Sequence, residues 1–389
     1  MNVRASGAST MKGRRSLTSI GRSIGADAAD LIARARAIET TDPSGARVFV
    51  QSARLLARES GDLAHEAESL YRLASLAHYD GQPGDALALA TEALEFADEH
   101  GVVLVQAWSL HLMAVVHSDS GNHAEALALC LRALTLYRST DHVLDEGNIL
   151  NTLATIHHEL GDVDRAILNY DAARKANARD GRSDFEAIAL SNIGSLRVER
   201  GDLDEGIELG RRAVDVGRRH ATGFLPRLLT SFAESLARRA DPERDDIGVA
   251  REVLGEACRL LDDSAVAFDD ALRAEVELAT GRLEMQSGRI DAAEEHLREA
   301  LGLAQVIGAR RIELASIAAL ATLTKQVGRL AEAVAFLEAR CDVAERLAKD
   351  GLDNRVRTMQ IAHDAENSRQ RTEIVRLRLA VAQARHEVE

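Results

Sequence analysis

The sequence predicts an all-α protein, an α-solenoid of about eight stacked helical hairpins that ends in a long C-terminal helix. Three observations lead to this prediction. A glycine-centred pattern returns every 40 residues, apolar side chains within each unit are three and four residues apart, and aromatic residues make up only 3% of the 389 residues. An all-β chain of this length would contain many more β-branched and turn-forming residues than this one does.

The chain begins with a segment that we expect to be disordered. Residues 1–24 contain five basic residues and no acidic residue. They include no continuous apolar stretch, so they do not form a secretory signal. A degenerate helical pair is expected next, with helices near 25–39 and 45–60, and the array of hairpins is expected to extend over residues 25–347.

Each repeat is centred on a glycine that ends one helix and begins the turn to the next. Apolar residues such as Leu70, Leu73 and Ala74 form one helical stripe before the glycine, and a second stripe follows it. Small residues recur seven positions before the glycine and five and twelve positions after it. They let the helix axes approach closely. Ala240 replaces the glycine in one interrupted unit. The hairpins are therefore centred near residues 41, 81, 121, 161, 201, 243, 288 and 328.

The last element is predicted to be one long helix. Residues 352–389 contain no glycine and no proline, and Asp350-Gly351 forms the break before them. From about residue 372 the apolar residues step by three and four, which is the spacing of a coiled-coil seam. Two heptads are too short to be stable alone, so this seam needs a packing partner. The members of this C-terminal seam are Ile374, Leu377, Val381, Ala384 and Val388.

Composition and motifs exclude several classes of function. The net charge of −14 argues against nucleic-acid binding, which requires a basic face. The three cysteines are far apart and lack the spacing of zinc ligands, which fits a reducing cytoplasm. The sequence contains no run of 18 apolar residues, so no membrane-spanning helix is predicted. We find no phosphate-binding loop and no catalytic signature, so we expect neither enzymatic activity nor a cofactor.

The repeat pattern resembles the tetratricopeptide repeat (TPR) family. The Gly-Asp turn of that family is present at Gly161-Asp162 and Gly201-Asp202, and the pattern covers about residues 64–347. The 40-residue unit is similar to the longer repeats of bacterial regulators. The resemblance implies a right-handed superhelix in which the first helix of each hairpin lines a concave groove. An unrelated α-solenoid such as a HEAT array is the alternative.

The resemblance also implies which side chains face the groove. These lie thirteen, ten, six, three and two residues before each turn glycine, and Asn192 lies one step further round its helix. The candidate peptide-binding or protein-binding residues are Tyr71, His78, Tyr79, Trp108, His111, Asp119, Asn148, Asn151, His158, Glu159, Ser191, Asn192 and Glu199.

Three properties of this set favour binding of a peptide or protein segment. It holds the only tryptophan and two of the four tyrosines, which are residues that anchor binding pockets. Its asparagines can pair with an extended peptide backbone, or Asn192 can bridge neighbouring repeats instead. Asp119, Glu159 and Glu199 form an acidic ladder that would steer a basic partner, or are simply solvated. The histidines are expected to serve packing and not to bind a metal.

Two hypotheses for the whole chain follow. The C-terminal helix resembles the connector between TPR sensor arrays and the output domains of bacterial diguanylate cyclases and histidine kinases. In the first hypothesis, the array binds its ligand in the groove, and the C-terminal seam forms a homodimer that relays binding to an output domain absent from these 389 residues. In the second, the chain is a stand-alone adaptor whose last helix folds back and caps the solenoid.

Overall fold

The computed structural model describes residues 27–39, 42–140, 146–263 and 270–349, together with the single residues 352, 356, 360 and 378. The described residues form helices joined by short turns, and none of them is in a β-strand. The chain divides into two compact units: the first comprises residues 1–142 and 351–389, and the second comprises residues 143–350. The basic leader and the C-terminal seam predicted above lie outside the described residues.

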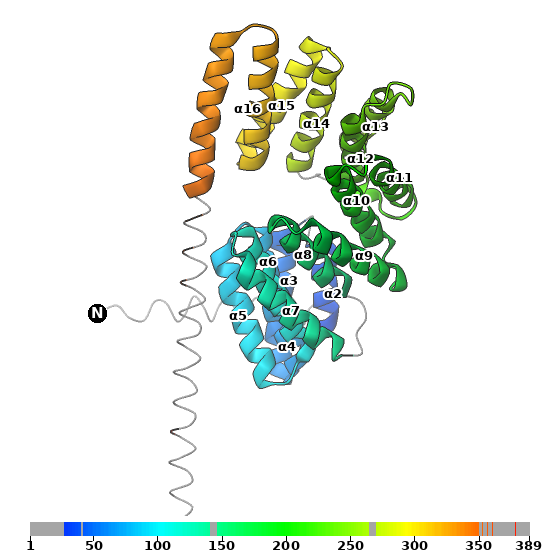
Figure 1. Cartoon of the computed structure of the whole chain (residues 1–389). Coiled ribbons are helices and arrows are strands. Elements are labelled where there is room, and N and C mark those ends of the chain that lie inside the picture. The colour runs from blue at the N-terminus through cyan, green and yellow to red at the C-terminus, as the bar shows by residue number, and fades with distance from the viewer. Residues whose placement is uncertain are drawn as a thin grey trace, which may run out of the picture. The chain divides into compact units, whose positions relative to one another are not determined.

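Residues 27–140 of the first unit form three helical hairpins (Figure 1). Consecutive helices pack against each other, and the first helix of each hairpin also contacts the first helix of the next. The helices are α2 (Ala28–Ile38), α3 (Pro43–Ser60), α4 (Leu63–Tyr79), α5 (Pro83–Glu99), α6 (Val103–Asp119) and α7 (His123–Arg138).

The second unit continues the same pattern with five hairpins, the last of which ends in a helix over residues 330–349. Its first helices α10, α12, α14 and α16 pack side by side in that order. The elements before residue 330 are α8 (Glu146–Glu159), α9 (Val163–Arg179), α10 (Ser183–Arg200), α11 (Leu203–His220), η1 (Thr222–Phe224), α12 (Leu225–Arg239), α13 (Asp246–Asp263), α14 (Asp270–Gln286), α15 (Ile290–Ile307) and α16 (Arg310–Gln326).

The turns lie where the repeat predicts them, so the all-α solenoid of eight hairpins is confirmed. The six predicted turn glycines all have positive φ, for example 79° at Gly161. Ala240 adopts the same left-handed conformation, with φ 50°, in the unit that lacks the glycine. A β-carbon is disfavoured there, but the buried Asp246 carboxylate stabilises the following loop by accepting hydrogen bonds from Arg239 and from the Asp241 backbone N–H.

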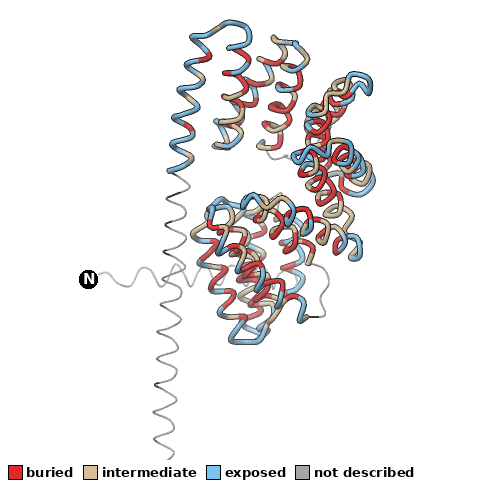
Figure 2. The backbone as a smooth tube through the Cα atoms, in the orientation of Figure 1, coloured by how far each residue is buried: buried red, intermediate tan, exposed pale blue. Residues whose placement is uncertain are grey.

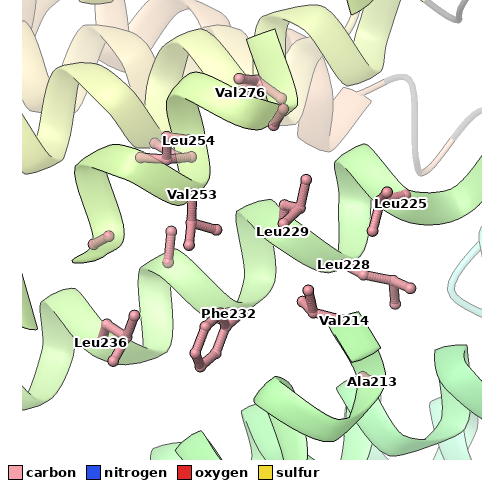
Figure 3. Close-up of a cluster of buried hydrophobic side chains, with 14 of the residues drawn as sticks. Ala213, Val214, Leu225, Leu228, Leu229, Phe232, Leu236, Val253, Leu254 and Val276 are labelled. Atoms are coloured by element: carbon pink, nitrogen blue, oxygen red, sulfur yellow. The ribbon is translucent and has the colours of Figure 1, made fainter. Parts of the chain in front are cut away.

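Small residues allow the helices of a hairpin to approach closely. A β-carbon added to Gly206 of α11 would lie 2.6 Å from the Gly194 carbonyl oxygen of α10. Buried residues follow the facing sides of the helices throughout both units (Figure 2). Figure 3 shows larger side chains from α11 to α14 converging around Phe232 and Leu229, which form the largest apolar cluster of the second unit.

Candidate functional site

The clearest hollow among the described residues lies on the side of the second unit formed by α10, α12 and α14. Its volume is about 410 Å³. A second hollow of about 550 Å³ lies between α14 and α16, and the two share Arg282 and Gln286. We call the two together the first-helix groove. Its lining residues are Ser195, Val198, Ser231, Ala233, Glu234, Ser235, Ala237, Arg238, Leu254, Ala279, Arg282, Leu283, Met285, Gln286, Ala315, Ala318, Ala319, Thr322 and Gln326.

Small side chains make this groove possible. Alanines and serines predominate on the parts of α12 and α16 that line it, so the helices leave space between them that larger side chains would fill. The hydroxyl groups of Ser195 and Ser231 lie 2.9 Å apart and connect α10 to α12. The side-chain amide of Gln286 donates to the Ala237 carbonyl at 3.0 Å and connects α14 to α12.

The groove carries charges of both signs. The Arg282 Nη1 atom lies 3.9 Å from Glu234 Oε1, a loose ion pair in which both side chains remain about half exposed. The pKa of Glu234 is raised because the hollow limits hydration of its carboxylate; Arg282 opposes the shift and Glu275 adds to it. Arg238 contributes a second guanidinium to the same wall. The groove can therefore offer hydrogen-bond donors and one carboxylate to a polar segment.

The aromatic residues predicted for binding differ in their surroundings. Tyr71 and Trp108 have ring centroids 5.4 Å apart, and both are half-buried and pack against the apolar cluster of Ala67, Ala97 and Val105. Tyr79 is 59% exposed. Tyr71 and Trp108 therefore contribute to packing, since the alanine-rich helices leave space beside them that the rings fill, and their role in binding stays a prediction.

Two members of the acidic ladder, Asp119 and Glu199, each lie near a histidine of the preceding hairpin. That histidine is three residues before the turn glycine of its own hairpin. His78 Nε2 lies 3.9 Å from an Asp119 carboxylate oxygen in the first unit. His158 Nε2 lies 3.2 Å from Glu199 in the second unit. Each pair joins the first helices of consecutive hairpins, so the ladder also connects repeats when the histidines are protonated. Glu159 is exposed at the end of α8.

The remaining predicted residues lie on α6, α8 and α10. His111, Asn148, Asn151 and Asn192 are half-buried on these first helices. Ser191 is only 6% exposed, so its side chain offers little surface to a ligand, and its role in binding stays a prediction. Its helix α10 packs on α9, α11 and α12, and the Ser191 carbonyl accepts a hydrogen bond from the Ser195 hydroxyl.

Sequence reasoning missed the charged residues of the first-helix groove. Glu234 and Arg282 lie six residues before their turns, and Arg238 and Gln286 lie two residues before them. These are the same offsets that gave the predicted set in the earlier repeats. Applying the offsets to the later repeats would have identified all four residues.

No cluster of histidine, cysteine, aspartate and glutamate able to hold a metal ion occurs among the residues that the structure describes. In the same part of the chain, none of the helices is long and apolar enough to span a membrane.

Comparisons with known proteins agree with the repeat architecture. The tetratricopeptide repeat model matches residues 105–179. No curated protein matches the sequence. Among solved structures, the apo form of the quorum sensor NprR from B. thuringiensis has a TM-score of 0.62 and 15% identity, and covers 81% of this chain and 86% of its own.

Two further solved structures have similar folds. The Rap conjugation gene regulator of the plasmid pLS20, in complex with the Phr* peptide, has a TM-score of 0.55 and 14% identity over 76% of this chain and 78% of its own. Aspartyl phosphate phosphatase F from Bacillus subtilis has a TM-score of 0.58 and 12% identity over 76% of this chain and 75% of its own. At these identities the similarity establishes the fold, and the chain is thus a TPR-like α-solenoid.

Proposed function

We propose that this chain is a non-catalytic, cytoplasmic module that binds an extended peptide or protein segment along the first helices of its hairpins. The observation that carries the proposal is the first-helix groove, which extends over α10, α12, α14 and α16. Its two hollows together are in the size range of ligand sites. The plasmid regulator, which has a similar fold, is in complex with the Phr* peptide, and this supports peptide binding.

The groove supplies what an extended polar segment needs. Arg238, Arg282 and the amide of Gln286 donate hydrogen bonds to carbonyl or carboxylate groups, and Glu234 accepts from amide or basic groups. The predicted residues of the earlier repeats, such as Asn148, Asn151 and Tyr79, extend the same first-helix surface within their own units. We propose that they make secondary contacts.

A peptide selection tests this function. A random peptide library displayed on phage would be selected against the full chain, and the affinity of the enriched peptides measured by titration calorimetry. Arg282→Ala, which removes the most central guanidinium, is expected to weaken binding about 10-fold or more. Arg212→Ala, at an exposed position of the second helix α11, is the matched control and should leave affinity unchanged.

The outcome for the earlier repeats is informative as well. If Trp108→Ala or Asn151→Ala reduces affinity and Arg282→Ala does not, the ligand contacts α6 of the first unit or α8 of the second unit and not the first-helix groove. If no peptide is enriched over an unrelated protein, the proposal of a peptide-binding module is wrong.

The finer part of the proposal concerns signal relay. We propose that the C-terminal helix forms a homodimer and transmits ligand binding to a signalling output domain of the diguanylate cyclase type. A ligand that prefers one hairpin packing over another would shift helix pairing by its difference in affinity. Light scattering on the full chain should give a dimer, and Leu377→Glu should shift it toward a monomer. A stand-alone adaptor, capped by its own last helix, would instead be monomeric.

A further inference from the structure

The first-helix groove carries more positive than negative charge, although the chain as a whole has a net charge of −14. The charged residues that line its two hollows are Arg238, Arg282 and Glu234, which are two guanidinium groups and one carboxyl group. The members of the acidic ladder lie outside the residues that line these hollows. A ligand in the groove therefore meets a local excess of positive charge.

Both guanidinium groups of the groove can accept an incoming anionic group. Arg239, the neighbour of Arg238 in the sequence, donates to Asp246 through its Nε and Nη2 atoms at 2.7 and 2.6 Å. Arg238 is exposed and makes no ion pair with any residue that the structure describes. Arg282 lies 3.9 Å from Glu234, which exceeds the length of a hydrogen bond. The donors of Arg238 and Arg282 are thus free to bind a carboxylate.

Glu234 competes only weakly for these donors. Its pKa is raised because its carboxylate is poorly hydrated in the hollow, and the nearby Glu275 adds to the shift. Its contact with Arg282 is loose, whereas Asp246 is held by two hydrogen bonds from Arg239. A ligand carboxylate can therefore approach Arg282 without breaking a hydrogen-bonded ion pair.

The boundary between the two hollows is formed by Arg282 and Gln286, because both residues line each hollow. An anionic group bound by Arg282 therefore has groove on both sides of it. The terminal carboxylate of a peptide would leave one hollow empty, whereas a side chain within the segment lets the chain continue into both. We therefore assign the anionic group to an internal aspartate or glutamate of the ligand.

The second hollow favours a different kind of side chain. Apart from Arg282, none of its lining residues is ionisable, and Met285, Ala315, Ala318 and Ala319 give it an apolar wall. Burial of an apolar side chain there is favourable, and burial of a charge is not. Packed helices lie about 8–10 Å apart, and two residues of an extended chain advance about 7 Å and point to the same side. The apolar residue should therefore lie two positions from the acidic one.

We propose that the first-helix groove binds an internal acidic side chain of an extended segment beside Arg238 and Arg282, with an apolar side chain two positions away in the second hollow. This inference rests on the peptide binding of the proposed function and names the class of peptide. Glu234 stays close to the bound carboxylate, where its charge limits affinity while its oxygens can accept a backbone N–H of the segment. The ligand of this groove is thus acidic, unlike the basic partner that the acidic ladder would steer.

A sequenced selection tests the predicted class of peptide. A random peptide library displayed on phage would be selected against the full chain, and the enriched peptides sequenced. Aspartate and glutamate should be enriched about 3-fold or more over lysine and arginine, with an apolar residue two positions away. The double variant Arg238→Gln/Arg282→Gln should lose this acidic preference. The matched control Arg212→Gln, at an exposed position of α11, should retain it.

The selection separates this inference from the proposed function. Enrichment of basic peptides, or an equal acidic preference in Arg238→Gln/Arg282→Gln, would overturn the inference and leave peptide binding established. If no peptide is enriched over an unrelated protein, the proposed function and the inference both fail.

Titration calorimetry with matched synthetic peptides gives an independent test. The most enriched peptide would be made with both termini blocked, together with a version whose acidic residue is replaced by its amide. Loss of this charge should weaken binding to the full chain about 10-fold. The two versions should bind Arg282→Gln with affinities within about 3-fold of each other, because the partner charge is already absent.

Glu234→Gln provides a change of the opposite sign. Glutamine keeps a hydrogen-bond acceptor and removes the competing charge, so the acidic peptide should bind this variant about 3-fold more tightly, and the amide version should bind as before. A gain of affinity cannot result from misfolding. If Glu234→Gln weakens binding of the acidic peptide, or if the peptide binds only with a free C-terminal carboxylate, the assignment of an internal acidic side chain to this site is wrong.

Discussion

The first helices of the two units carry different side chains at equivalent positions, and the difference determines where a hollow can form. In the first unit, Tyr71 and Trp108 lie ten and thirteen residues before their turns, and their rings stack on each other and on the core. In the second unit, most of the α12 residues that line the first-helix groove are alanines and serines, and a hollow of about 410 Å³ remains. Side-chain volume on the first helix therefore decides whether the surface is filled or open.

The largest expected effect comes from disturbing the close packing that both units share. Gly206→Ala would place a β-carbon 2.6 Å from the Gly194 carbonyl and 2.9 Å from the Val198 nitrogen, so α10 and α11 must separate. We expect the free energy of unfolding to fall by about 3 kcal/mol, measured by urea denaturation.

Gly302→Ala is the matched control for this change. Nothing lies within 4 Å of a β-carbon at Gly302, inside α15. The substitution should raise stability by about 0.5–1 kcal/mol, because alanine favours the helix. Equal effects of the two substitutions would mean that close packing is not what the glycines provide.

The second prediction separates packing from binding among the aromatic residues. Trp108→Ala should lower the free energy of unfolding by about 2 kcal/mol, because the ring packs on Tyr71 and on an apolar cluster. Tyr79→Ala, at a residue that is 59% exposed, should change it by less than about 0.5 kcal/mol. A Trp108→Ala chain of unchanged stability would return this ring to the role of a binding anchor.

The fold was predictable because its determinants repeat. The small residues and the turn glycine recur in most units, so an irregular unit such as that of Ala240 could be placed by its neighbours. The groove was not predictable in the same way. A hollow results from missing volume across several helices, as at Ser231 and Ala279, and no single residue signals it. The sequence also could not separate the two roles of the aromatic residues, because a large ring between alanine-rich helices can serve packing as well as recognition.

The third prediction concerns the connection between α12 and α14 beside the groove. Gln286→Ala removes the hydrogen bond to the Ala237 carbonyl and should cost about 0.5–1 kcal/mol, since the bond is exposed to solvent. Gln326→Ala changes the equivalent residue on α16, which also lines the groove, and should cost less. If both variants unfold at the same urea concentration, the Gln286 bond does not stabilise the helix pair.

The smallest expected effect is electrostatic and arises from the groove itself. The raised pKa of Glu234 means that its ionisation opposes folding, so stability should fall slightly as pH rises through the interval from the unfolded to the folded pKa. Glu234→Gln should remove this dependence and stabilise the chain at neutral pH by less than about 0.5 kcal/mol, because the half-exposed side chain is screened by solvent. Urea denaturation at pH 4 and pH 7 measures both effects. If the free energy of unfolding depends more strongly on pH in the variant than in the original chain, the carboxyl group with the raised pKa is not Glu234. The groove would then lack the poorly hydrated carboxylate that is proposed to accept a hydrogen bond from the ligand.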